Sequence, residues 1–462
     1  METRGVPPVR RRLSRRRFSA LLGLGAVAAT GLPIGRRRPA ASAQDVLIVD
    51  PETEQRTESI GESAQTVWVE ATGHTMSSVL LDYWRATGRD ELFGNPISEP
   101  FETPDGIWSQ AMEAGIIQYL PEYMWTLEPF VRFMPAGRML LADLNGGFRG
   151  DGKRMGGGGN PRAGAWALPE GSSLSGVVGY AAETAVEVAE PFRGWYLDRD
   201  AAWYLGQPLT PLITERGRPA QWFEGGLLLE EATGPKLAPL GAELAARLDL
   251  DTTPVEQGDL PVDDESVFLT VPNPFATGNA AGPGRKRIDV DVTDQQVRLF
   301  AGETMVLESF ISTGLWPNKT ELGNFRVRYK KRLEDMRGAT DEDGAVVWIV
   351  GEGGSPPPGS IPYGVSDVPD VLYINQQAEA LHGAYWHNNF GETMSHGCIN
   401  QPLDVAAFVY DWAPLGTPVR VLVHDGEVYP GSENATPKEL AEAAEDALTA
   451  GGLSSPFAVG GA

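Results

Sequence analysis

Residues 381–400 read LHGAYWHNNFGETMSHGCIN. This stretch contains three of the five histidines in the chain, and it ends two residues after Cys398, the only cysteine among 462 residues. A single cysteine excludes an intramolecular disulfide framework. The first question that the sequence raises is therefore what one thiol can do beside several imidazoles.

Four roles for Cys398 are open. Many free cysteines are small buried hydrophobes, but an unpaired thiol oxidises readily in an exported protein, and this chain begins with an export signal described below. Zinc binding is disfavoured because the spacing H-x4-H-x8-H-x-C fits no common structural zinc site. Covalent attachment of a haem or lipid lacks a C-x-x-C-H motif or a signal-peptide cysteine. A cysteine nucleophile with a histidine base needs one thiol and one imidazole, so the sequence favours this role, with no metal and no cofactor.

The residues around this stretch predict a mainly β domain. Apolar and polar residues alternate with period 2 over residues 287–292, and a short Asp-rich turn separates them from an apolar run at 296–300. One helix is expected, over Pro402–Trp412, with Asn400 as its N-cap. Further strands are expected at residues 305–313, 323–329, 348–350, 371–374 and 419–423.

Several motifs of this domain resemble those of the L,D-transpeptidase (YkuD) catalytic domain. The cysteine of Ser395-His396-Gly397-Cys398-Ile399-Asn400 follows sixteen residues after the histidine of His382-Gly383. Upstream, Asp289–Phe300 resembles the opening hairpin of the family, and Ser312-Thr313-Gly314 with Thr320-x-x-Gly323-x-Phe325 resembles its S-T-G…T-P-x-G-x-F segment. Two positions depart from the family pattern. Glu321 stands where proline is usual, and Asn400 stands where arginine is more common.

The resemblance implies a β-sandwich catalytic domain with its active site under a lid-like hairpin. It implies that Cys398 is the nucleophile that forms a thioester and that His382 is the proton acceptor and donor. His396 and Gly397 would support the loop, and the N–H groups of Gly397 and Cys398 would form the oxyanion hole. A backbone carbonyl, such as that of Gly383, would fix the tautomer of His382. The residues expected to bind substrate are Ser395, Asn400, Gly383, Tyr385 and Trp386.

The activity that the resemblance implies is acyl transfer between peptidoglycan stem peptides. The bond between the third residue of a tetrapeptide stem and D-Ala would be cut, and the acyl group would pass to an amine of a neighbouring stem to give a 3→3 cross-link. With water as the acceptor, the same site would be an L,D-carboxypeptidase. A non-catalytic wall-binding protein and a papain-type peptidase are the alternatives, although a papain-type nucleophile lies early in its chain and heads a helix.

An internal repeat precedes this domain. Residues 92–98 (LFGNPIS) recur as residues 204–210 (YLGQPLT), and residues 110–116 (QAMEAGI) recur as residues 221–227 (QWFEGGL). The pattern resembles LGFP-type repeats, which occur on exported cell-envelope proteins, and this resemblance implies attachment to the cell wall. Ordinary packing turns with tryptophan and tyrosine in the core remain the alternative.

The N-terminus has the layout of an export signal. Residues 1–43 hold ten arginines and one acid, contain an apolar run from Phe18 to Ile34, and end in Ala41-Ser42-Ala43. Residues 14–18 (SRRRF) resemble the twin-arginine (Tat) motif, so the protein is expected in the cell envelope. Glycines and a proline interrupt the apolar run, so no stable membrane span is expected, and an uncleaved anchor is the alternative.

Charge and composition complete the division of the chain. The net charge is −24, and the part after residue 43 carries 28 basic and 61 acidic residues. Such acidity argues against a nucleic-acid partner, because phosphate contacts need clustered cations. The expected parts are a signal peptide (1–43), an acidic linker (44–72), two repeat modules (73–145 and 190–250) joined by a Gly-rich connection (146–189), a second linker (251–284), the catalytic domain (285–424) and a tail (425–462).

Overall fold

The computed structural model describes residues 65–141, 186–275, 284–350 and 355–432, apart from residues 105, 127, 138, 139, 216, 425, 426 and 428. The expected signal peptide, most of the Gly-rich connection and most of the expected tail lie outside these residues. No helix in the described part of the chain is long and apolar enough to cross a membrane.

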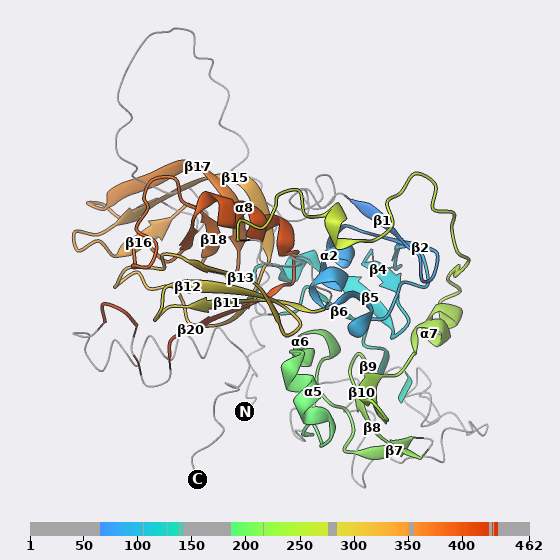
Figure 1. Ribbon diagram of the computed structural model, residues 1–462. Coiled ribbons are helices and arrows are strands. Elements are labelled where there is room, and N and C mark those ends of the chain that lie inside the picture. Colours follow the sequence, from blue (N-terminus) through green and yellow to red (C-terminus); the bar gives the residue numbers. More distant parts are fainter. Residues whose placement is uncertain are drawn as a thin grey trace, which may run out of the picture. The chain divides into compact units, whose positions relative to one another are not determined.

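The C-terminal segment, residues 284–432, contains two five-stranded sheets (Figure 1). The first sheet has the order β13-β12-β11-β20-β14, in which only the β11–β20 pair is parallel. Alternate residues of β12 are buried, so the strand turns one face to the core. The bounds are β11 Lys286–Asp291, β12 Gln296–Ala301, β13 Thr304–Phe310, β14 Gly323–Arg326 and β20 Pro418–Leu422.

The second sheet has the order β16-β15-β17-β18-β19 and carries the candidate site. Its two long strands pair antiparallel, whereas β18 and β19 pair parallel. Helix α8, Leu403–Trp412, packs against β17 and β18 (Figure 1). The bounds are β15 Tyr329–Thr340, β16 Val346–Ile349, β17 Ile361–Tyr373, β18 Ala380–Gly383 and β19 Ile399–Gln401. Two packed sheets with one flanking helix confirm the expected mainly β, sandwich-like domain.

The sequence pattern did not predict three strands of the second sheet, β15, β18 and β19. Most of β15 is strongly charged, although its Lys330 is buried and donates to the Ala413 carbonyl at 2.9 Å. Strands β18 and β19 are too short to show a period. The expected cap of α8 was wrong, because Asn400 lies within β19 and Pro402 is the residue that precedes the helix.

The N-terminal segment, residues 65–141, and the middle segment, residues 186–250, each contain a four-stranded antiparallel sheet. The N-terminal sheet is β3-β4-β5-β6, preceded by the β1–β2 hairpin and helix α2. The middle sheet is β10-β9-β8-β7, preceded by α5 and α6 and followed by α7. Bounds in the N-terminal segment are β1 Thr66–Val69, β2 His74–Ser77, α2 Ser78–Ala86, η2 Arg89–Glu91, β3 Phe101–Glu102, β4 Trp108–Ala111, β5 Ile116–Tyr119, η3 Pro121–Tyr123 and β6 Val131–Phe133. Those in the middle segment are α5 Phe192–Asp198, α6 Ala201–Leu205, β7 Ile213–Glu215, β8 Arg218–Phe223, β9 Gly226–Glu231, β10 Gly234–Leu237 and α7 Gly241–Arg247.

The repeated sequence blocks make the same contacts in both segments. Glu113 accepts a hydrogen bond from the backbone N–H of Asn95 at 2.8 Å, and Glu224 accepts one from the backbone N–H of Gln207 at 3.2 Å. The carbonyls of these two glutamates in turn accept from a glycine of the other segment. Gly241 donates to Glu113 O at 3.0 Å, and Gly137 donates to Glu224 O at 2.9 Å. Each segment therefore packs on the corresponding turn of the other.

Two of the expected linkers are partly ordered. Strand β1 lies inside the expected acidic linker (44–72), and residues 251–275 pack against the rest of the chain. Glu265, in the short helix η4 Glu265–Val267, is buried and contacts Arg85 at 3.0 Å and Lys286 at 2.6 Å. The ion pairs and the burial of Phe268 explain why this Pro-rich, acidic segment adopts a defined course.

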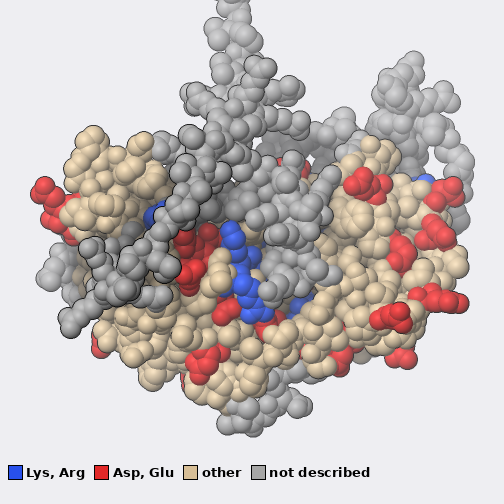
Figure 2. Space-filling view, turned by 90° about the horizontal axis from the view of Figure 1, so that it is seen from above, with Lys and Arg blue, Asp and Glu red and all other residues tan. Residues whose placement is uncertain are grey.

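Acidic side chains dominate the visible surface charge. On the face shown in Figure 2 they are spread over the described surface, while the basic side chains gather in a small central group. This distribution agrees with the net charge of −24.

Candidate active site

The parallel pairing of β18 and β19 brings the candidate nucleophile and base together. Leu381 pairs with Ile399 and His382 with Asn400. Cys398 immediately precedes β19, next to Ile399, and the partner of Ile399, Leu381, immediately precedes His382. His382 is fully buried and Cys398 is 8% exposed.

His382 has the features of a neutral base. Its Nδ1 lies 3.2 Å from the Gly383 carbonyl, which is the contact that the sequence led us to expect, and this acceptor fixes the ring proton on Nδ1. Its Nε2 is buried and has no hydrogen-bond partner in the described part of the chain. Burial lowers the pKa of His382 to about 4, so the imidazole is neutral near pH 7 and Nε2 is free to accept a proton.

Cys398 is a protonated thiol at rest. Burial raises its pKa to about 12, the charge of Glu379 adds to this rise, and the N–H of Ala380 opposes it. A thiol of this kind needs a base to remove its proton during attack. The resting pair is therefore a neutral thiol and a neutral imidazole rather than an ion pair.

The loop before Cys398 is held by its own side chains. Gly397 has a φ of 126°, a region that side-chain-bearing residues avoid. Its N–H donates to Ser395 Oγ at 3.1 Å, and Ser395 Oγ donates to the carbonyl of Cys398. This corrects the expected oxyanion hole, because the Gly397 N–H is already engaged. The N–H of Cys398 has no acceptor among the described residues, so it remains the candidate oxyanion donor.

His396 supports the same loop by stacking. Its ring lies 4.5 Å from that of Tyr363 with an interplanar angle of 16°. Tyr363 belongs to β17 and lies near the start of that strand, far from the residues of β17 that pair with β18. This end of the paired strands β15 and β17 thus lies beside the loop that precedes Cys398 (residues 395–397, the nucleophile loop), where the family resemblance implied a lid.

Asn400 contacts His387, a residue that the sequence pattern did not single out. His387 Nε2 lies 2.9 Å from the amide nitrogen of Asn400, while its Nδ1 accepts from the N–H of Asn389 at 3.2 Å. Burial lowers the pKa of His387, so the neutral ring carries one proton, which must be on Nε2. Asn400 must then present its oxygen, which otherwise has no partner. Asn400 and His387 therefore orient each other at the end of β19.

The remaining expected substrate-binding residues divide into two groups. Gly383 and Ser395 are buried and support the backbone rather than offering a surface to a substrate. A Cβ at Gly383 would lie 2.9 Å from a side-chain carbon of Pro369, so neighbouring side chains leave no space beside Gly383. Trp386 lies 5.7 Å from the His382 ring, and Tyr385 packs edge-on against Trp386 at 5.1 Å with 46% of its surface exposed. Trp386 therefore lies beside the candidate base, and Tyr385 lies next to Trp386.

One cluster in the described residues could hold a cation. Asp291, Asp294 and His424 bring their ligand atoms within 4.8 Å of one another. Arg298 already contacts Asp291 at 3.0 Å, and His424 contacts the same carboxylate at 2.9 Å. Cationic groups thus already satisfy this carboxylate, and the cluster contains no residue of the candidate catalytic site.

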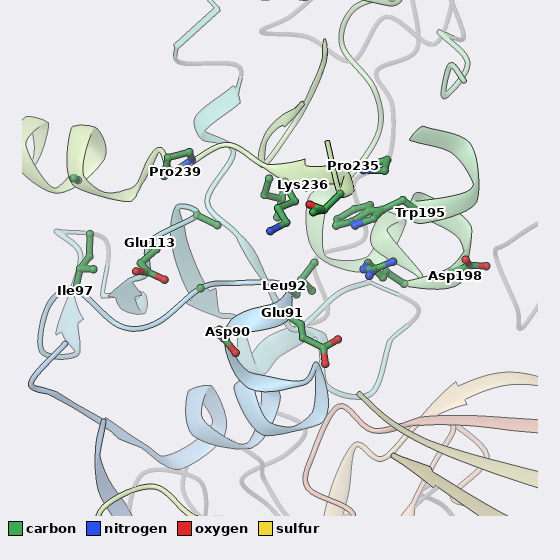
Figure 3. Close-up of a pocket in the computed structure, with 16 residues that line it drawn as sticks. Asp90, Glu91, Leu92, Ile97, Glu113, Trp195, Asp198, Pro235, Lys236 and Pro239 are labelled. Carbon is green, nitrogen blue, oxygen red and sulfur yellow. The ribbon is translucent and has the colours of Figure 1, made fainter. Parts of the chain in front are cut away.

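A pocket of about 980 Å³ lies between the N-terminal and middle segments, and none of the candidate catalytic residues lines it. Trp195, Arg199 and Lys236 line one part, and Glu91 and Glu113 line another. Figure 3 shows Lys236 and Glu113 pointing into this pocket from different elements.

Comparison with known proteins defines the class of this fold and site. The family model of YkuD, the L,D-transpeptidase catalytic domain, matches residues 285–421. The chain therefore carries an L,D-transpeptidase catalytic domain in its C-terminal segment.

Solved structures of L,D-transpeptidases are similar to part of the chain. An L,D-transpeptidase from Mycobacterium smegmatis is 21% identical, with 30% of this chain and 58% of that chain covered and a TM-score of 0.23. A mutant L,D-transpeptidase from Enterococcus faecium is 24% identical, with 30% and 49% covered and a TM-score of 0.24. The catalytic domain of an E. faecium L,D-transpeptidase is 27% identical, with 30% and 96% covered and a TM-score of 0.24. No curated protein matches the chain in sequence.

Proposed function

We propose that this protein is an L,D-transpeptidase that joins peptidoglycan stem peptides through a thioester on Cys398. The observation that carries the proposal is that His382, which is buried in the strand paired with the one that follows Cys398, keeps an Nε2 without a hydrogen-bond partner in the described residues. The match of residues 285–421 to the family supports the same reaction class.

The first half of the reaction forms the thioester. The Cys398 sulfur attacks the carbonyl carbon of the third stem residue while its proton passes to His382 Nε2. The resulting oxyanion accepts a hydrogen bond from the N–H of Cys398, and one such donor contributes about 3 kcal/mol to the transition state. The bond to D-Ala breaks, and the leaving amine takes the proton from His382.

The second half regenerates the thiol. An amine of a neighbouring stem attacks the thioester and gives its proton to His382, which returns a proton to the departing sulfur. The product is a 3→3 cross-link between two stems. With water in place of the amine, the same steps release a shortened stem, so L,D-carboxypeptidase activity is the second candidate.

Intact-protein mass spectrometry with a carbapenem tests the nucleophile. One similar structure is described as an L,D-transpeptidase in complex with imipenem, a member of this class. The wild-type chain should gain one covalent adduct, and Cys398→Ala should gain none. An unmodified wild type, or an equal adduct on the variant, refutes the assignment. Release of D-Ala and formation of dimers from purified tetrapeptide stems then separate transfer from hydrolysis.

We further propose that the N-terminal and middle segments are two copies of one module and that they hold the protein on the cell wall. Stem peptides end in carboxylates, and the pocket between the modules contains the side chains of Arg199 and Lys236, neither of which makes a hydrogen bond or ion pair in the described residues. Trp195 stacks beneath the Arg199 guanidinium at 4.9 Å and adds an apolar surface.

Sedimentation with purified sacculi tests this role. Full-length Cys398→Ala, which cannot react, should sediment with the sacculi, and the added changes Arg199→Ala and Lys236→Ala should reduce the bound fraction by about tenfold through loss of two charged contacts. Arg247→Ala is the matched control, because Arg247 pairs with Glu243 and lies outside the pocket. Equal sedimentation of all these variants would leave the modules without a binding role at this pocket.

Wall-linked chemistry requires export, and we propose that the arginine-rich N-terminus directs the protein through the Tat pathway. The twin-arginine-like motif at residues 14–18 and the small-residue site at residues 41–43 support this route.

A further inference from the structure

Thr320 supports the nucleophile loop through a hydrogen bond to its backbone. Thr320 is fully buried, and its Oγ1 donates to the carbonyl of Gly397 at 2.6 Å. The same oxygen accepts from the N–H of Gly314 at 2.9 Å. The position of Thr320 therefore determines where the backbone immediately before Cys398 lies.

Two side chains from elsewhere in the chain hold this brace. The N–H of Thr320 donates to the phenolic oxygen of Tyr429 at 2.8 Å. The N–H of the next residue, Glu321, donates to the Glu379 carboxylate, with 3.1 Å to each oxygen. Glu379 also lies directly behind the loop, because a Cβ added at Gly397 would be 3.1 Å from its Oε1.

The side chains of Glu379 and Glu321 share one amide nitrogen. Asn375 is fully buried, and its Nδ2 donates to Glu379 at 2.8 Å and to Glu321 at 2.9 Å. Part of Glu379 reaches the surface, but its carboxylate is enclosed by Glu321, Asn375 and Gly397. Two carboxylates this close in a poorly hydrated site cannot both be charged without a large cost.

Burial and the neighbouring carboxylate act in the same direction. Burial raises the pKa of Glu379 to about 8 and the charge of Glu321 adds to the rise, while the Glu321 N–H, Asn375 and the more distant Lys319 oppose it. Near pH 7 Glu379 is therefore mostly protonated. Loss of that proton would place a further negative charge beside Cys398 and make its thiolate harder to form.

We propose that Glu379 is a positioning residue for Cys398, which shares a proton with Glu321, holds the Thr320 brace against Gly397 and keeps negative charge away from the attacking sulfur. The proposal rests on the role of Cys398 given above. Glu379 differs from the catalytic pair in that it acts through the backbone of the loop and through its charge.

The pair is also the chemical reason for the glutamate at position 321. Proline at this position would have no N–H to donate to Glu379 and no carboxylate to share its proton. The phenol of Tyr429, the thiol of Cys398 and the ammonium of Lys319 are the other titratable groups that face Glu379. The phenol and the thiol are neutral near pH 7, since burial raises the pKa of both.

The pH profile of carbapenem acylation tests the proposal. In the wild-type chain the rate of adduct formation should be level near pH 7, where His382 is neutral and Cys398 is a thiol, and should fall above about pH 8, where Glu379 loses its proton. Glu379→Gln cannot ionise, so its rate should stay level and exceed the wild-type rate by about threefold or more near pH 9, each normalised to pH 7. Identical normalised profiles for the two proteins would overturn the inference.

A second variant keeps the test open if Glu379→Gln folds poorly. Glu321→Gln removes the like charge while Glu379 stays, so the inflection of the profile should move to lower pH by about one unit. An unmoved inflection contradicts proton sharing. Absence of any adduct on the wild type would instead count against the proposed function. That outcome differs from adduct formation whose pH profile is the same in the wild type and in both variants, which would count against the role of Glu379 alone.

Discussion

At the scale of single residues, catalysis depends on how burial distributes protons. His382 and Cys398 are both removed from water, which favours the neutral form of each. The carbonyl of Gly383 orients the imidazole without adding a charge. Such a pair stays unreactive until a substrate carbonyl approaches, because proton transfer and attack must occur together. In an oxidising environment a neutral thiol of this kind is protected, since the thiolate is the form that oxidises.

A neutral buried histidine makes the fold sensitive to acid. The folded-state pKa of His382 is about 4 against an ordinary value near 6.5, so the unfolded chain binds the proton more tightly. Stability is therefore complete above about pH 6.5 and falls as the pH drops towards 4, by about 2 kcal/mol at pH 5. Thermal unfolding at several pH values checks this. His382→Gln should lose this part of the acid sensitivity, and His424→Gln, at an exposed position, should keep it. Equal pH slopes for wild type and His382→Gln would contradict the expectation.

At the scale of elements, the catalytic loop is supported from both directions along the chain. Residues 312–322 connect β13 to β14 and hold Gly397 through Thr320, and the segment after β20 contributes Tyr429. Tyr429 lies beyond the last residue matched by the family model. It is 5% exposed and also donates to the carbonyl of Gly314 at 2.7 Å. The first residues of the expected tail thus belong to the structural support of the site.

Removal of one hydroxyl tests this support. Tyr429→Phe should slow carbapenem acylation by about tenfold at neutral pH, because it leaves the Thr320 N–H without its acceptor. The measurement is the rate of adduct formation by mass spectrometry. Tyr196→Phe is the control, because it removes a hydrogen bond of 2.9 Å to the Gly206 carbonyl in the middle segment. Acylation of Tyr429→Phe at the wild-type rate would show that the loop keeps its position without Tyr429.

At the scale of the whole molecule, the described segments share buried polar contacts. Arg326 of β14 is 3% exposed, donates to the Tyr204 hydroxyl at 2.7 Å and to the Gly416 carbonyl at 2.9 Å, and pairs with Asp200. Arg328 donates to the Thr126 carbonyl at 2.6 Å. The middle and N-terminal segments therefore each satisfy a cation that the catalytic domain would otherwise bury unpaired.

Truncation of Arg326 should destabilise the entire chain. Arg326→Ala leaves Asp200 and the Tyr204 hydroxyl without their partner, and the free energy of unfolding should fall by about 3 kcal/mol. Denaturant unfolding followed by fluorescence measures this change. Arg337→Ala is the control, because the side chain of Arg337 is 55% exposed and its pair with Asp335 lies at the surface. A loss no larger than that of the control would mean that the segments do not depend on this contact.

Several features followed from the sequence because they are local. The candidate pair His382 and Cys398 could be recognised because the two residues lie only sixteen positions apart in the sequence. The alternation in residues 287–292 and 296–300 predicted strands that bury one face. Helix α8 was also recognisable from its own residues. In contrast, β15 was missed because it buries Lys330, whose ammonium donates to the carbonyls of Tyr410 and Ala413, about 80 positions away in the sequence.

The sequence by itself determined which residues we propose as nucleophile and base, since one thiol and a histidine sixteen residues before it leave few alternatives. Only the tertiary structure decided what surrounds them. It engages the Gly397 N–H with Ser395, encloses Glu379 beside Glu321 and brings Tyr429 under Thr320. These contacts join residues up to 109 positions apart. Their protonation depends on the solvent that packing excludes, and no local pattern records how much water a side chain loses on folding.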